Sequence, residues 1–293
     1  MIETSGFNTA WAEHHGFLLD VAYRLLGSYS DAEDMVQEAF SRLLRSDLDP
    51  IEDVRAWLVV VVSRLCLDHL RSARVRHEAY IGPWFPEPIV DTDPSAVITM
   101  DESVRMAMLI VLERMSPAER VVFVLHDVFD YPFEKIARMV GRTPAACRQL
   151  ASRARRRVRE EGDNTRIKHD LAEQQRVVDA FIAATAGGDV SKLLSLLDPS
   201  VVGWADVGGA MPEVRHPNVG AGIVGPNVLR FFGPASGSRL ESRSINGEPA
   251  VVVYRMGEVA AVIALTHKAG AITRVYVVSA PLKLEHVRRA LAG

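Results

Sequence analysis

The spacing of apolar residues divides the chain into parts of different character. Through residues 7–76 and 99–161, apolar residues recur at the interval of amphipathic helices. Beyond Pro199 the chain changes to valine-rich runs separated by glycine-containing turns, which is typical of strands. The predicted strands are Ala250–Met256, Val259–Thr266 and Ala271–Ser279, with helices over Leu171–Ala186, Val190–Leu197 and Leu282–Leu291. The pattern therefore predicts a multi-domain protein: an all-α front followed by a C-terminal α+β domain.

Capping signals predict where the front helices begin. Ser30 and Glu33 have the spacing of a capping box, and the helix that they begin should run to about Leu44. Ser116 and Glu119 have the same spacing, with a proline at the first helical position. On the first of these helices a polar face lies opposite an apolar stripe. That polar face holds Asp34, Gln37, Glu38 and Ser41.

A basic helix-turn-helix pattern ends the helical part of the chain. A short helix over Phe133–Val140 should stop at Gly141, and Thr143-Pro144 begins another helix at once. Residues 142–159 contain seven arginines and no acidic residue. One face of this second helix is apolar and should pack on the first, which leaves the other face for DNA. The expected DNA-facing residues are Arg142, Thr143, Ala145, Arg148, Gln149, Ser152, Arg153 and Arg156.

The chemistry of these side chains suits the major groove. Arg148, Gln149 and Ser152 can reach base edges, where a good bidentate pair discriminates between bases by roughly 1–3 kcal/mol. Arg153 and Arg156 would hold phosphates, for which a fixed positive charge is sufficient. The alternative is a basic helix that is merely solvated or that binds an acidic protein.

A second candidate nucleic-acid surface lies on the predicted helix Val54–Arg76. Aromatic and arginine side chains interleave there with apolar positions, and Arg64 and Asp68 have the i,i+4 spacing of an ion pair. Aromatic rings can stack on unpaired bases while guanidinium groups hold the backbone. For Trp57 taken alone, core packing is the alternative. The expected contact residues are Arg55, Trp57, Arg64, Asp68, Arg71 and Arg74.

A proline-rich linker, residues 77–98, separates the two helical parts. Its prolines disfavour helix and make a semi-rigid spacer. Tyr80, Trp84, Phe85 and Pro86 make it too apolar for a freely solvated segment. We therefore expect the linker to dock on a folded surface.

Composition excludes several classes of protein. The net charge of -3 is close to neutral, so it does not reveal the basic helix. Cys66 and Cys147 fit neither a zinc motif nor a disulfide framework, and we expect no metal and no cofactor. The first residues have no basic region followed by an apolar stretch, and no apolar run reaches the length of a membrane span, so we expect neither a signal peptide nor a membrane helix. These features predict a soluble cytoplasmic protein with no membrane partner.

Two segments resemble the extracytoplasmic-function (ECF) sigma factors, which are sigma-70 family subunits of RNA polymerase. LLDVAYRLLGSYSDAEDMVQEAFSRLL and the later RAWLVVVVSRLCLDHLR resemble their region 2. LERMSPAERVVFVLHDVFDYPFEKIARMVGRTPAACRQLASRARRRV resembles their region 4. The resemblance implies region 2 over residues 1–76 and region 4 over residues 99–161, both all-α.

The resemblance also implies a function. The chain would bind core RNA polymerase and direct promoter-specific transcription initiation, and it would not be an enzyme. The SDAEDMVQEAF segment would bind the clamp coiled coil of the β′ subunit, and region 4 would lie at the β flap. The Asp47–Asp53 loop and the helix after it would hold the melted -10 strand. The Thr143–Arg159 helix would read the double-stranded -35 element.

The C-terminal part, residues 171–293, resembles a SnoaL-like domain, a cone-shaped α+β fold. VVDAFIAATAGGDVSKLLSLLDPSVVGWADVGG is similar to the start of such domains, and YIGPWFPEP is similar to the linker of the SigJ-like ECF subgroup. In that subgroup the fused domain takes the place of a separate anti-sigma protein, which implies regulation by the tail. Two subgroup motifs, Asp-Gly-Gly-Gly-Lys and Asn-Pro-Asp-Lys-Leu, read Asp206-Val207-Gly208-Gly209-Ala210 and Ala280-Pro281-Leu282-Lys283-Leu284 here.

A pocket in this domain could be lined by Trp204, Asp206, Tyr254 and Tyr276. An aspartate with a tyrosine could supply a base and an oxyanion donor. The simpler interpretation is that Asp206 caps a turn and Tyr276 packs in the core. Because the cone fold hosts enzymes and binding modules alike, two other functions stay open. They are a helix-turn-helix repressor with a ligand-binding tail and an enzyme domain tethered to DNA.

Overall fold

The protein folds into two compact units that do not follow the order of the chain. A computed structural model describes residues 4–46, 51–78, 82–91, 98–161, 170–209, 211 and 216–292. Unit 1 comprises residues 1–79, 97–99 and 111–161, and unit 2 comprises residues 80–96, 100–110 and 162–293. The linker and the start of the second helical region therefore belong to the same unit as the C-terminal domain.

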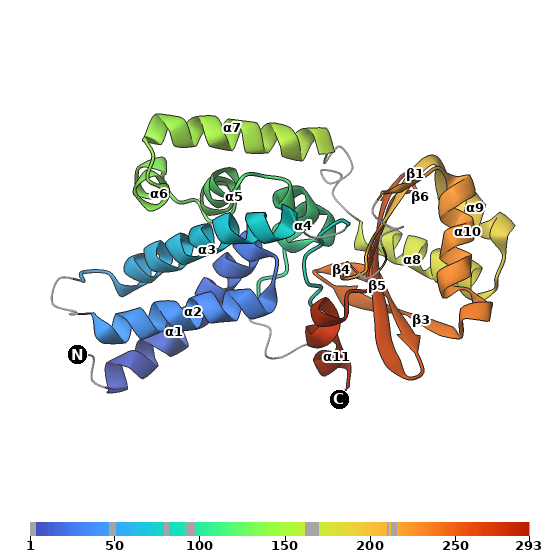
Figure 1. Cartoon of the computed structure of the whole chain (residues 1–293), viewed down its shortest axis with the longest axis horizontal. Coiled ribbons are helices and arrows are strands. Elements are labelled where there is room, and N and C mark those ends of the chain that lie inside the picture. The colour runs from blue at the N-terminus through green and yellow to red at the C-terminus, as the bar shows by residue number, and fades with distance from the viewer. Residues whose placement is uncertain are drawn as a thin grey trace. The chain divides into compact units, whose positions relative to one another are not determined.

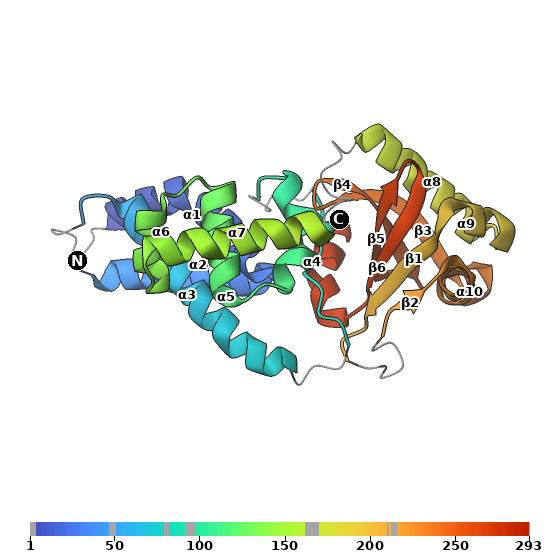
Figure 2. The ribbon, with the colours of Figure 1, turned by 90° about the horizontal axis from the view of Figure 1, so that it is seen from above.

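Unit 1 is built from helices. Helix α5 lies between α3 and α7 and contacts both (Figure 1), and α7 runs over α5 and α6 (Figure 2). Helices α1, α2 and α3 pack on one another. The elements are α1 (Thr4–Leu26), α2 (Tyr29–Arg45), α3 (Val54–Glu78), α5 (Pro117–Phe123), the π-helical turn η2 (Val124–Val128), α6 (Phe133–Val140) and α7 (Pro144–Glu161).

The two predicted capping boxes have different outcomes. At α2 the predicted cap Ser30 is wrong, because the cap is Ser28, whose hydroxyl accepts a hydrogen bond from the Asp31 amide at 3.2 Å. The box at Ser116 is confirmed: the Glu119 carboxylate accepts the Ser116 amide at 3.0 Å, and the Ser116 hydroxyl accepts the Glu119 amide. Each serine has an acidic residue three positions later, Asp31 after Ser28 and Glu33 after Ser30, so the spacing alone could not choose between them.

The helix-turn-helix prediction is confirmed. Helix α6 ends at Gly141, which has the left-handed backbone angles φ 66° and ψ 43°. Thr143 then caps α7, its hydroxyl accepting the Ala146 amide at 3.2 Å. The predicted apolar face of α7 is inside unit 1, and its buried residues are Cys147, Ala151, Ala154 and Val158.

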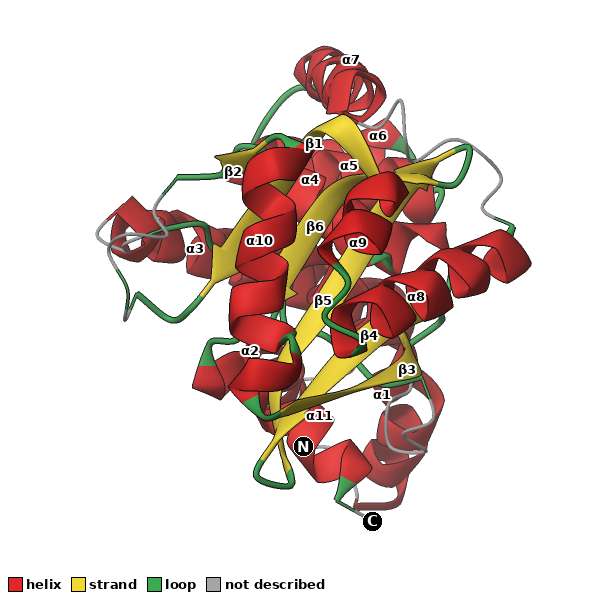
Figure 3. Ribbon diagram, turned by 90° about the vertical axis from the view of Figure 1, so that its right-hand side faces the viewer, coloured by secondary structure: helices red, strands yellow, loops and turns green. Residues whose placement is uncertain are grey.

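Unit 2 is centred on a six-stranded sheet with the order β2-β1-β6-β5-β4-β3. Strand β1 runs parallel to β6, and every other neighbouring pair is antiparallel. Helices α8, α9 and α10 cover one face of the sheet (Figure 3). The strands are β1 (Leu197–Asp206), β2 (Asn218–Val219), β3 (Ser238–Ile245), β4 (Glu248–Arg255), β5 (Glu258–Lys268) and β6 (Ala271–Val278). The helices are α8 (Leu171–Ala186), α9 (Val190–Leu196), α10 (Ala221–Phe232) and α11 (Glu285–Leu291), with 3-10 turns η4 (Pro234–Ser236) and η5 (Pro281–Leu284).

A separate hydrophobic core lies on each face of this sheet. The core beneath α8, α9 and α10 includes Val178 and Phe181. The core on the opposite face receives Phe85 and Val90 from the linker and Met106 and Ile110 from α4 (Met106–Glu113), which follows η1 (Glu102–Val104). Burial of apolar side chains on both faces explains why the central strands read as nearly continuous apolar runs. The expected architecture, helical domains followed by an α+β domain, is confirmed.

Replacing Gly141 by alanine should destabilise the protein through the backbone alone. No atom lies within 4 Å of where the new Cβ would be, so the cost is that of a left-handed angle for a residue with a side chain, about 1 kcal/mol. Gly222→Ala is the matched control, because it also enters open space but in the first turn of α10. It should stabilise by about 0.5 kcal/mol. Urea unfolding monitored by circular dichroism measures both, and a Gly141→Ala protein as stable as the parent would contradict the assignment.

Candidate functional site

The predicted DNA-facing side of α7 is open to solvent. All eight predicted residues, from Arg142 to Arg156, are exposed. Arg148 donates to the Glu134 carboxylate at 3.0 Å and its guanidinium lies 5.6 Å from the centre of the Phe133 ring. Arg156 lies 3.7 Å from the Glu160 carboxylate. Because both arginines keep exposed side chains, these surface ion pairs would exchange readily for phosphate or base contacts.

The second candidate nucleic-acid surface, on α3, is arranged differently from the prediction. Asp68 pairs with Arg71 at 3.1 Å and not with Arg64, since the i,i+3 partner lies on the same exposed edge. Arg64 instead donates to the Arg138 carbonyl of α6 at 3.1 Å. Trp57 is half-buried, which keeps the core-packing interpretation open for it.

The predicted α3 surface includes two further residues, Arg55 and Arg74, besides the group formed by Arg64, Asp68 and Arg71. The Arg55 guanidinium lies 4.1 Å from the centre of the Phe17 ring of α1. The side chain of Arg74 and residues 47–50 of the predicted Asp47–Asp53 loop lie outside the described residues.

A cleft of about 400 Å³ separates α3 from α6. Arg64, Asp68 and Arg71 line one wall, and residues 138–140 of α6 with Gly141 line the other. Three residues predicted for one nucleic-acid surface therefore face the first helix of the helix-turn-helix within unit 1. A nucleic acid bound to these three residues would lie next to α6.

The polar face of α2 carries the residues predicted to bind the polymerase clamp. Asp34 and Gln37 are exposed, while Glu38 and Ser41 are partly exposed. Glu38 accepts a hydrogen bond from Arg42 at 2.8 Å, and this bond holds the pKa of the Glu38 carboxyl below its usual value. The face therefore presents polar and acidic side chains to solvent, with Glu38 paired to Arg42.

The linker is attached to the C-terminal domain by a buried ion pair. The Phe85 amide donates to the Asp206 carboxylate at 2.8 Å, and the Lys283 ammonium donates to the same carboxylate at 2.6 Å. The ammonium also donates to the Phe85 carbonyl at 2.5 Å and lies 3.5 Å from the centre of the Trp84 ring. Asp206 is fully buried, and Phe85 and Lys283 are nearly so. We call Phe85, Asp206 and Lys283 the Phe85 anchor.

A second attachment lies a few residues further along the linker. Ile89 and Asn246 exchange two hydrogen bonds, from the Ile89 amide to the Asn246 side chain at 3.0 Å and from the Asn246 amide to the Ile89 carbonyl at 2.9 Å. The Asp91 carboxylate accepts the Gly247 amide at 3.0 Å and the Ser244 hydroxyl. Of the residues predicted to dock, Trp84, Phe85 and Pro86 lie at these attachments, whereas Tyr80 lies outside the described residues.

Of the four predicted pocket residues, Trp204 alone borders a cavity, and it also packs against the core on the linker face of the sheet. A cavity of about 220 Å³ lies between the sheet and α10, and Trp204 lines it. Asp206, Tyr254 and Tyr276 do not line it, because their positions along the strands turn them toward the linker face. Asp206 caps a turn by accepting the Gly208 amide at 3.1 Å, and Tyr276 packs edge-on against Phe85 with ring centres 5.6 Å apart. The proposed aspartate–tyrosine pair is therefore not assembled in this cavity.

Sequence reasoning missed several of the residues that attach the linker. Lys283 lies in the segment that was compared with a subgroup motif. Nothing in the local sequence indicated that its ammonium pairs with Asp206, which is 77 residues earlier in the chain. Asn246-Gly247 is a recognisable hairpin turn, and both residues have positive φ. The sequence indicates the type of turn, but it does not indicate that the Asn246 side chain accepts a hydrogen bond from Ile89 of the linker.

Two kinds of site are not found in the described part of the chain. No group of three or more histidine, cysteine, aspartate or glutamate side chains there could hold a metal ion. None of the helices described is both long and apolar enough to cross a membrane. Cys66 and Cys147 are buried, and burial raises the pKa of both thiols.

Comparisons with known proteins identify the family. A family model described as Sigma-70 region 2 matches residues 10–76, and one described as Sigma-70, region 4 matches residues 105–158. SigI of Mycobacterium tuberculosis, described as a probable ECF RNA polymerase sigma factor, is 43% identical over 293 residues, which cover 98% of this chain and 97% of SigI. The chain belongs to the ECF sigma factors.

The same family is found among solved structures. The crystal structure of the M. tuberculosis ECF sigma factor SigJ matches this sigma factor with a TM-score of 0.75 and 36% identity, over 97% of this chain and 99% of that one. This sigma factor therefore binds core RNA polymerase and directs promoter-specific transcription initiation. The repressor alternative is not favoured, because it leaves region 2 unexplained.

Removing the ammonium of the Phe85 anchor should destabilise unit 2 strongly. In a Lys283→Met protein the fully buried Asp206 carboxylate loses its counter-ion, a change that typically costs about 3–5 kcal/mol. Lys192→Met is the matched control, since Lys192 also pairs with an aspartate but at an exposed position. Thermal unfolding should show a lower midpoint for the first variant and little change for the second. Equal midpoints for the two would show that the buried pair contributes nothing.

Proposed function

We propose that the C-terminal domain sets the activity of this sigma factor by holding the linker between regions 2 and 4. The observation that carries the proposal is the Phe85 anchor, in which a buried ion pair of the C-terminal domain binds both backbone groups of a linker residue. A linker held in this way cannot change its path until those hydrogen bonds break. The C-terminal domain would then do within one chain what a separate anti-sigma protein does elsewhere.

The hold extends from the linker into region 4. The matched region 4 begins at residue 105, and Met106, Ala107 and Ile110 of α4 lie in the same core as Phe85. Arg105 lies 3.9 Å from Glu248, a carboxyl whose pKa burial raises to about 7. The first residues of region 4 thus pack in the core of the C-terminal domain. This packing supports the proposal that the C-terminal domain limits the movement of region 4.

The contacts in unit 1 support a resting form that differs from the promoter-bound one. Arg64, Asp68 and Arg71, which we propose hold the melted -10 strand together with Arg55, share a cleft with α6 of region 4. The -10 and -35 elements lie apart along the DNA, so a form that binds both must separate α3 from α6. Interactions that fix the linker would stabilise the resting form.

The remaining surfaces complete the proposal. The polar face of α2, centred on Asp34 and Gln37, would bind the β′ clamp, and region 4 would meet the β flap. The exposed face of α7 would read the -35 element through Arg148, Gln149 and Ser152. Residues 1–76, 77–98, 99–161 and 171–293 would serve as region 2, linker, region 4 and regulatory domain. We propose a regulatory and not a catalytic role for the last, because the described residues that line its cavity include no acid and no histidine.

Loosening the linker should raise transcription. In an Asp91→Ala protein the linker loses its bonds to Gly247 and Ser244, so opening should cost less and open complexes should form about fivefold more readily, the lower end of typical couplings. Run-off transcription with core polymerase and permanganate footprinting of the melted strand measure this.

The control for that experiment is Asp198→Ala. Asp198 accepts the same two kinds of hydrogen bond, from the amide and the hydroxyl of Ser200, but on β1 and away from the linker. It should leave transcription unchanged. If Asp91→Ala and Asp198→Ala proteins form open complexes equally well, the C-terminal domain does not act through the linker.

Arg148 and Arg156 should differ in what they contribute to promoter binding. Arg148→Ala should relax the preference at one -35 position, because a base contact is lost. Arg156→Ala should weaken all promoters alike and reduce the salt dependence of binding, because a phosphate contact is lost. Binding of holoenzyme to a -35 sequence library at two salt concentrations measures both. Indistinguishable profiles would refute this division between the two arginines.

A further inference from the structure

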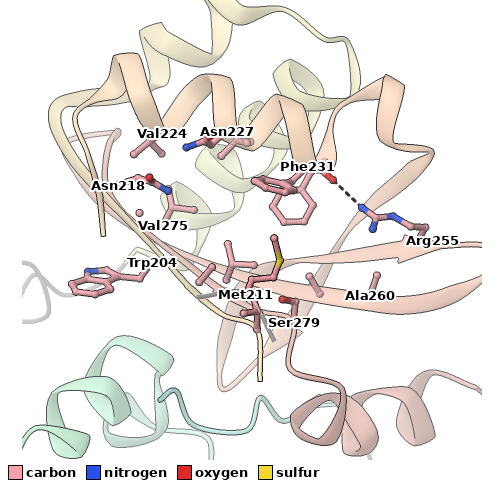
Figure 4. Close-up of a pocket in the computed structure, with 17 residues that line it drawn as sticks. Trp204, Met211, Asn218, Val224, Asn227, Phe231, Arg255, Ala260, Val275 and Ser279 are labelled. Atoms are coloured by element: carbon pink, nitrogen blue, oxygen red, sulfur yellow. Dashed lines mark hydrogen bonds between the residues drawn. The ribbon is translucent and has the colours of Figure 1, made fainter. Parts of the chain in front are cut away.

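The cavity between the sheet and α10 in unit 2 takes no part in the proposed function. Strands β1, β5 and β6 form its floor and α10 forms its roof, with Met211 at one side (Figure 4). Its volume of about 220 Å³ exceeds that of apolar protein cavities known to take up benzene. It therefore has room for a small organic molecule, on the order of ten non-hydrogen atoms.

The lining of the cavity is apolar with a few hydrogen-bonding groups. Valine, alanine, phenylalanine and methionine side chains make up most of it. The polar exceptions are Asn218, Asn227, Ser279 and Arg255, while Trp204, which also borders the cavity, packs against the core on the opposite face of the sheet. An apolar enclosure with a small number of polar groups is the usual composition of a site for a small molecule.

Arg255 is the only charged residue among the described residues that line the cavity. Its guanidinium donates to the Phe231 carbonyl at the end of α10 at 2.9 Å and to the Ser238 hydroxyl at 3.2 Å. This bridge joins α10 to the sheet at one end of the cavity (Figure 4). A guanidinium has five N–H donors, so the same group can bind an oxygen of a ligand while it keeps this bridge.

We propose that this cavity binds a small, mainly apolar molecule that carries an acceptor oxygen, as a ketone or a carboxylate. Asn218, Asn227, Ser279 and Arg255 all offer N–H or O–H donors to such an oxygen. An amine of the same shape should bind more weakly, because the described residues that line the cavity include no carboxylate to balance an ammonium and their one charged side chain is positive. The claim concerns binding alone and does not depend on regulation through the linker.

The test uses three naphthalenes of equal size that carry an acetyl, a carboxylate or an aminoethyl group. Titration calorimetry with the full-length protein should give saturable binding of the first two and at least about tenfold weaker binding of the amine, the effect of one charge-assisted hydrogen bond. Arg255→Gln separates the two oxygen classes, since it should weaken the carboxylate about tenfold and leave the ketone nearly unchanged. No polymerase is present, so the result stands whether or not the linker controls transcription.

Variants locate the binding. Ala205→Phe places a ring into the cavity from β1 and should abolish binding, whereas Ile223→Phe adds the same ring on the exposed side of α10 and should not. Should the Ala205→Phe protein fail to fold by circular dichroism, Asn227→Leu replaces it, because it removes a donor at nearly constant volume. That variant should bind both oxygen compounds several-fold more weakly.

The outcomes decide the proposal in either direction. Selective binding of the oxygen compounds that is lost in Ala205→Phe, or weakened in Asn227→Leu, establishes the site. Binding of all three naphthalenes with equal affinity overturns the proposed ligand class. Absence of saturable binding, or affinities in both cavity variants equal to those of the Ile223→Phe protein, overturns the site itself.

Discussion

Lys283 and Asp206 form an ion pair that is buried from solvent. A linker residue, Phe85, supplies some of the hydrogen-bond partners that water would otherwise provide. Burying two charges costs several kcal/mol each, and their mutual attraction offsets this only when the remaining hydrogen-bonding groups are also satisfied. The Phe85 amide and carbonyl provide two of those partners. The ion pair and the linker are therefore interdependent: without the linker the C-terminal domain would hold incompletely paired charges. This dependence ties a connection between two promoter-binding regions to the folding of a third part of the chain.

Helix α4 extends the same dependence into the sigma regions. Its first residues, including Met106 and Ile110, complete the core on the linker face of the sheet, and the boundary between the two compact units falls just after Ile110. Region 4 cannot be detached from the C-terminal domain without exposing these side chains. Regulation by a fused domain is thus possible without a flexible tether, since the regulator and the regulated region share one core.

The sequence predicted the helical elements and the helix-turn-helix well because their signals are local. Gly141 and the Ser116 box act within a few residues of themselves, and the apolar stripe of α7 is periodic. Strands β1, β2 and β3 and helix α10 went unpredicted. Strand β3, SRLESRSI, lies at an edge and is mostly polar, and the helix contains Pro226 together with internal glycines. For Asp206 and Tyr276 the sequence could not decide between a pocket and the simpler interpretation, a turn cap and a packed ring, because which face of a strand a residue occupies depends on a register that only the assembled sheet determines.

The division of the molecule into units has a consequence for how such proteins can be recombined. By sequence the chain reads as region 2, region 4 and an appended domain, which invites a breakpoint near residue 162. By structure that breakpoint would leave residues 82–91 and the start of α4 with the wrong partner, dividing a core between two parental proteins. Chimaeras between sigma factors of this kind should therefore inherit the segment from the linker through Ile110 together with the C-terminal domain, as one heritable block. Because they share one core, the segment from the linker through Ile110 and the C-terminal domain should also accumulate compensating substitutions during evolution.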